Sequence, residues 1–160
     1  MREFNFEWKG TKALKTVLKV PFYRVSMQLY NGRTDIPVRV SFWRSNASWL
    51  TVCSRMHDIS DRLEVGALAF EMQTIEPTSE LAVVDMMPSP FVPVDIKKLI
   101  IRDADVVAES GIRLSSKDGK VITIAAGGFP YSLAIAGVRD EIANIFKTEY
   151  EIEKYEVVPL

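Results

Sequence analysis

The 160-residue chain is 48% hydrophobic and 26% charged and has a net charge of −1, values typical of a globular protein with a substantial core. Its basic residues are scattered, which argues against a nucleic-acid partner, and no apolar run approaches the roughly 20 residues of a membrane-spanning helix. The single cysteine excludes an internal disulfide and multi-cysteine metal sites. The first residues contain no apolar segment of the signal-peptide type, so we expect a cytoplasmic protein.

The N-terminal part of the chain combines a strand pattern with a helix pattern. Aromatic and polar residues alternate over residues 4–8, which predicts a short strand. From residue 11 the apolar residues recur at helical spacing, and we predict an amphipathic helix over residues 11–19 that Thr11 caps and Pro21 ends. The lysines on its other face are more simply explained as a solvated surface than as a site for an acidic partner.

Segments with strand alternation follow. Residues 23–29 and 38–43 alternate apolar and polar side chains on either side of Asn31-Gly32, which is typical of a hairpin. Pro37 cannot donate a hydrogen bond to a neighbouring strand, so it belongs at a strand start or on a sheet edge. A further strand begins at Leu50 and ends at Asp58.

Residues 63–73 fit both a helix and a strand. Ser60 could cap a helix with one apolar face, whereas the same residues also alternate as they would in a strand. Gly66 weakens either assignment. Because short, turn-separated strands surround this segment, we predict a strand.

Residues 74–95 are predicted to be irregular, with only residues 81–84 forming a brief strand. Prolines interrupt this segment repeatedly, at Pro77, Pro88, Pro90 and Pro93. A long proline-rich connection is typical of a lid, a binding loop or a crossover. Met86, Met87 and Phe91 give the segment apolar surface, and we include them among the candidate binding residues.

The clearest pattern lies between residues 108 and 137, where alternation and turn chemistry agree on consecutive β-strands. A three-residue loop over residues 117–119, with Gly119 in the left-handed conformation, places Leu114 opposite Ile122 and makes one face of the hairpin apolar. A two-residue loop here would pair two lysines and put apolar residues on both faces. The pattern therefore favours the longer loop.

The remaining segments complete a mainly β protein. Residues 99–107 have strand character, residues 139–147 fit a helix, Tyr150 and Ile152 alternate with acidic residues, and Val157-Val158 fits a last strand. We predict one β-rich domain over residues 1–160, built as an antiparallel barrel or a two-layer sandwich with two short helices.

Few residues have a pattern that indicates chemistry. Cys53 and His57 would share a strand face but lie roughly 13 Å apart, too far for a thiolate–imidazole pair. Asp103 and Asp105 would share a face as in a two-carboxylate metal motif, but such pairs are common by chance among 21 acidic residues. The sequence also lacks a phosphate loop, a dinucleotide fingerprint and a serine elbow, so we expect neither a cofactor nor a metal and lean against catalysis.

The glycine pair Gly127-Gly128 allows two interpretations. Successive backbone amides could form a nest for an anion, but a corner between two strands, entered through Pro130, explains the same residues more simply.

The functional prediction is therefore a soluble, non-catalytic binding or interaction module. Trp43 and Trp49 flank a turn that contains Arg44, a combination typical of interface anchors and also of core residues. The expected partner is a protein or a small apolar ligand, and open strand edges predict a two-fold homodimer. The alternative is a small-molecule-binding β-barrel, such as a carboxylate-dependent hydrolase or isomerase. The candidate binding residues are Trp43, Arg44, Trp49, Met86, Met87, Phe91, Gly127, Gly128, Phe129 and Tyr131.

Overall fold

A computed structural model describes residues 1–30, 36–60, 63–74, 82–103, 105–137 and 147–160, with residues 82–86 described by their backbone. The elements are β1 (Arg2–Phe4), α1 (Leu14–Leu18), β2 (Phe22–Leu29), β3 (Pro37–Arg44), β4 (Trp49–Ser60), β5 (Leu63–Gln73), β6 (Ala82–Phe91), β7 (Pro93–Asp103), β8 (Val106–Ser116), β9 (Val121–Ala126), β10 (Leu133–Ala136), η1 (Ile152–Lys154) and β11 (Glu156–Pro159). The mainly β prediction is confirmed.

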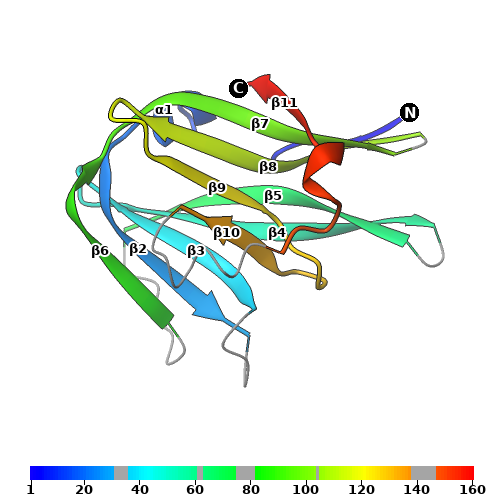
Figure 1. Cartoon of the computed structure of the whole chain (residues 1–160), viewed down its shortest axis with the longest axis horizontal. Coiled ribbons are helices and arrows are strands. Elements are labelled where there is room, and N and C mark those ends of the chain that lie inside the picture. Colours follow the sequence, from blue (N-terminus) through cyan, green and yellow to red (C-terminus); the bar gives the residue numbers. More distant parts are fainter. Residues whose placement is uncertain (31–35, 61–62, 75–81, 104, 138–146) are drawn as a thin grey trace.

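The strands form two antiparallel sheets that face each other (Figure 1). Sheet A has the order β10-β9-β8-β7-β11, with β1 added in parallel beside β8, and sheet B has the order β5-β4-β3-β2-β6. The sheets do not close on each other, so the sandwich alternative is confirmed and the barrel alternative is wrong.

The main core lies between the sheets, because alternate side chains of each strand point inward. Met27 and Phe42 from sheet B pack with Ile112 and Ile124 from sheet A, and all four side chains are fully buried. Burying a side chain of this size stabilises the fold by about 1.5–3 kcal/mol. The α1 helix adds Val17 and Leu18 to the same core.

The predicted β8–β9 hairpin is confirmed in register and in turn conformation. Leu114 pairs with Ile122, and the amide of Ser116 donates to the carbonyl of Lys120 at 2.8 Å, which encloses a three-residue loop. Gly119 has φ +85°, in the left-handed region that glycine adopts without strain. The third strand of this meander, β10, follows β9 as expected.

The strand prediction for residues 63–73 is confirmed, and the structure explains the glycine within it. A Cβ at Gly66 would lie only 2.6 Å from the Cβ of Ala126, so β5 approaches sheet A too closely for a side chain. The Gly66 amide donates to Oε2 of Glu149 at 3.0 Å, and its carbonyl accepts from Ser110 at 2.6 Å. Gly66 thus marks a direct contact between the two sheets.

The prediction of an irregular segment over residues 74–95 is wrong for its second half. The β6 strand continues through Pro88 and Pro90 because it is the edge strand of sheet B and pairs only with β2. Only Val92 separates β6 from β7, so the chain passes directly from sheet B into sheet A at this corner (Figure 1). The structure therefore shows a sheet-to-sheet corner where the sequence had suggested a lid or binding loop.

The strand predicted over residues 38–43 is the central strand β3, between β2 and β4. Pro37 is tolerated because it begins that strand. The single strand predicted over residues 99–107 is also wrong, since β7 ends at Asp103 and β8 starts at Val106. Asp105 lies in the turn between them, so the two aspartates do not share a strand face.

The helical predictions are met in part. The first helix is shorter than predicted, and Ala13 occupies its N-cap without a side-chain hydrogen bond, so the predicted Thr11 cap is wrong. The helix expected over residues 139–147 and the turn at Asn31-Gly32 lie almost entirely outside the described residues. A 3-10 turn, η1, replaces the alternation expected around Ile152. No helix among the described residues has the length and apolarity needed to span a membrane.

Candidate functional site

The N-terminal segment connects sheet A to the edge strand β5 of sheet B. Its β1 strand pairs with β8, and Glu7 then pairs with β5, donating its amide to Leu68 at 3.0 Å and accepting from Phe70 at 2.9 Å. Between these contacts the amide of Phe6 donates to Oε1 of Glu109 at 2.8 Å. The segment is therefore held by its backbone and forms a wall along the β5 edge of sheet B.

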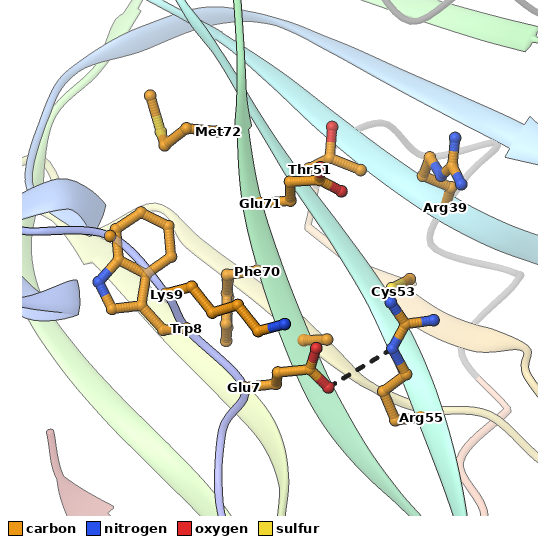
Figure 2. Close-up of a pocket in the computed structure, with 12 residues that line it drawn as sticks. Glu7, Trp8, Lys9, Arg39, Thr51, Cys53, Arg55, Phe70, Glu71 and Met72 are labelled. Carbon is orange, nitrogen blue, oxygen red and sulfur yellow. Dashed lines mark ion pairs between the residues drawn. The ribbon is translucent and has the colours of Figure 1, made fainter.

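A compact loop continues this wall. The indole N–H of Trp8 donates to the carbonyl of Lys12 at 2.8 Å. A Cβ at Gly10 would lie 2.0 Å from the Trp8 ring, so the indole covers the glycine backbone directly. Lys9 lies between them in the chain, and Figure 2 shows its ammonium group extended toward Glu7 and Phe70.

A groove of about 440 Å³ lies between this wall and the outer face of sheet B. Its size is in the usual range of small-molecule sites. Trp8 and Met72, both half-buried, form its apolar end beside the buried core residue Phe70, while Thr51 and Cys53 of β4 lie along its floor (Figure 2). The remaining lining residues are Glu7, Lys9, Gly10, Arg39, Arg55, Ala69 and Glu71.

The β4–β5 register explains why this space is open. Cys53 pairs with Ala69, and Arg55 pairs with Ala67, so small side chains on β5 stand beside larger ones on β4. Cross-strand neighbours of this kind share one face of the sheet. The small side chain of Ala69 therefore helps to keep the groove open.

The groove carries more positive than negative side chains. Lys9, Arg39 and Arg55 supply three cations against the two carboxylates of Glu7 and Glu71. Nε of Arg55 lies 3.6 Å from Oε2 of Glu7, with the two side chains 52% and 46% exposed. In the part of the chain that the structure describes, Lys9 and Arg39 form no ion pair. The groove is thus a cationic site with one apolar end.

A second cavity of about 300 Å³ continues along the same face and shares Glu7 and Arg55 with the groove. His57 lines this second cavity, and its ring stacks on Phe4 with centroids 4.3 Å apart. Burial raises the pKa of the Cys53 thiol, and the nearby Arg55 opposes this effect only in part. A protonated thiol in one cavity and a stacked imidazole in the other do not form a nucleophile–base pair.

The predicted tryptophan site proves to be largely structural. The rings of Trp43 and Trp49 lie 5.0 Å apart, and the guanidinium of Arg24 lies 5.4 Å from the centroid of Trp49. Trp43 donates its indole N–H to the hydroxyl of Tyr23. Trp49 is buried despite its place on the outer face of sheet B, so its area contributes to stability.

Arg44 also has a structural role. Its guanidinium is buried and donates to the carbonyl of Val17 at 3.0 Å and to the Ser48 hydroxyl at 2.7 Å. Burial lowers its pKa. The side chain therefore fastens the end of α1 to the β3–β4 turn.

The candidates from the proline-rich segment lie on β6. Phe91 is buried and stacks on Phe22 with centroids 5.1 Å apart, and Met87 packs against the main core. The backbone of Met86 pairs with Arg24, and its side chain lies outside the described atoms. Phe91 and Met87 thus belong to the core rather than to a site.

The candidates at residues 127–131 form the β9–β10 corner. The amide of Gly127 donates to Ser132 at 2.8 Å, and the amide of Gly128 donates to Lys147 at 3.0 Å. Both amides are thus occupied by backbone carbonyls, which argues for the corner and against an anion nest. Phe129 and Tyr131 are 43% and 59% exposed, but they lie on sheet A, away from the groove.

The structure therefore does not bring the sequence candidates together into one site. The groove residues were missed because they come from the N-terminal segment and from three strands, β3, β4 and β5. The alternation of Thr51, Cys53 and Arg55 was a usable signal for one shared face, but their position beside Glu7 depends on a contact between distant parts of the chain.

Among the described residues, no three His, Cys, Asp or Glu side chains are placed to hold a metal ion. Comparison of the chain with family models, curated proteins and solved structures found no match in any of the three.

Proposed function

We propose that this protein is a non-catalytic binding module whose groove on sheet B takes a small apolar anion. The observation that carries the proposal is the arrangement of Lys9, Arg39 and Arg55 around a groove whose other end is apolar. A ligand with an aromatic or aliphatic body and one acidic group would satisfy both parts of this lining. Apolar contact would supply most of the affinity, and the cations would fix the orientation.

A binding role is also favoured by what the groove lacks for turnover. Its one thiol is disfavoured as a thiolate, and the histidine stacks on Phe4 in the neighbouring cavity. The barrel-enclosed site considered as an alternative is not retained, because the sheets do not close and this groove opens at the edge of sheet B.

Two related dyes test the proposal: 8-anilinonaphthalene-1-sulfonate, and N-phenyl-1-naphthylamine, which has the same rings without the sulfonate. Both are expected to bind with a rise in fluorescence. Replacing Cys53 by Phe fills the groove and is expected to abolish binding of both dyes. Replacing Arg39 by Gln is expected to weaken the sulfonate dye selectively, because it removes a cation without closing the apolar end.

The matched control is Lys117→Gln, which changes the net charge equally at the exposed β8–β9 turn. It should bind both dyes as the native chain does. Absence of dye binding by the native chain, or full binding by Cys53→Phe, would contradict the proposal. Native mass spectrometry of freshly purified protein would further show whether an acidic small molecule copurifies.

A further inference from the structure

Arg55 occupies a position that no other cation of the groove shares. Its side chain lines both the larger groove and the second cavity, whereas Lys9 and Arg39 line the larger groove alone. The cross-strand neighbour of Arg55 is Ala67, whose small side chain leaves the space beside the guanidinium open. A planar guanidinium with open space beside it suits a carboxylate or sulfonate that binds through two oxygens.

Glu7 is the other residue shared by the two cavities. Its backbone is fixed by two hydrogen bonds to β5, so the segment cannot move away without breaking them. Its carboxylate is held more loosely. The 3.6 Å separation from Arg55 exceeds the roughly 2.7–2.9 Å of a charge-assisted hydrogen bond, and both side chains are about half exposed.

We infer that Arg55 is the anion-binding residue of the groove and that the Glu7 carboxylate is its intramolecular competitor. In the structure Glu7 lies beside Arg55, and the acidic group of a bound ligand takes its place. The Glu7 side chain then turns aside while its backbone stays paired with β5. This inference rests on the proposed function, since it assigns the anion site within the same groove.

The competition should be weak and sensitive to salt. Exposed ion pairs contribute little to stability, so a ligand displaces Glu7 at a small cost. Removing the Glu7 charge while keeping its shape should therefore tighten anion binding by about threefold to tenfold, since it also removes a repulsive charge beside the ligand. Screening should reduce this gain at high ionic strength.

The test measures the dissociation constants of the two dyes for the native chain, Glu7→Gln, Arg55→Gln and the double variant, at low and high salt. Glu7→Gln should bind the sulfonate dye about threefold to tenfold more tightly at low salt and bind the uncharged dye unchanged. Arg55→Gln should weaken only the sulfonate dye. In the double variant the gain from Glu7→Gln should be much smaller, because the residue for which Glu7 competes is absent and only its repulsion of the sulfonate remains.

The outcomes separate this inference from the proposed function. If the native chain binds both dyes and Cys53→Phe binds neither, but Glu7→Gln leaves the sulfonate dye unchanged, the competitor role is wrong and the binding function stands. An equal gain for both dyes would also overturn it, because a steric effect does not depend on the sulfonate. If neither dye binds to any variant, the binding function itself is overturned. Thermal melts of all variants establish that each is folded.

Discussion

Replacing Gly119 by Val should destabilise the fold through backbone strain alone. Gly119 has φ +85°, and a Cβ placed there would meet no heavy atom within 4 Å. Steric clash with the rest of the protein is therefore absent, and the cost comes from holding an L-residue in the left-handed region. That cost is about 1–2 kcal/mol, and a β-branched side chain is among the least suited to this region.

The assay is a thermal melt followed by circular dichroism. For a chain of this size each kcal/mol lowers the midpoint by about 2–4 °C, so the valine variant should melt about 2–8 °C below the native chain. Gly119→Asn is the matched control, since asparagine enters the left-handed region more easily and should lose less. An unchanged midpoint for the valine variant would show that the turn assignment is wrong.

The other predictions concern pH and self-association. Burial raises the pKa of Glu149 to about 7 from an ordinary value of 4.5, so the folded state binds the proton more tightly, and stability should fall as pH rises between about 4.5 and 7. In urea titrations Glu149→Gln should lack this part of the pH dependence, and an identical pH slope in both proteins would contradict it. Self-association remains a prediction. Among the described strands, β11 is an edge of sheet A and exposes Val157, so it is the candidate edge for pairing with a second copy. Sedimentation velocity should then show a dimer, and Val157→Lys should weaken it. A single species near 18 kDa at all concentrations would refute it.

The sequence predicted strands and their register most reliably where these depend on residues close together in the chain. The β8–β9 register followed from the turn at Gly119 and from alternation on either side of it, and both belong to one short segment. The β6 strand was missed because prolines normally exclude a strand. Pro88 and Pro90 are acceptable because β6 is an edge strand and both lie in the break of the β2–β6 register between Met86 and Phe91.

The groove could not be predicted either, because it depends on a contact between distant parts of the chain. The alternation on β4 places Cys53 and Arg55 on one face, but nothing local shows that Glu7 will pair with β5 beside them. The tryptophans gave a stronger sequence signal, yet Trp49 is buried beneath its neighbours. Large aromatic residues mark stable packing at least as often as they mark a site.

The pairing of β1 with β8 also has a consequence for the order of folding. Arg2 pairs with Val106, so the first strand to be synthesised has no partner until most of the chain exists. Closing so long a loop is entropically costly, and contacts of this separation form late. The β1 strand, whose Phe4 ring stacks on His57 in the second cavity, should therefore be added to a sandwich that has already assembled. A nascent chain would acquire its core first and this cavity last, so a compact folding intermediate would still lack it.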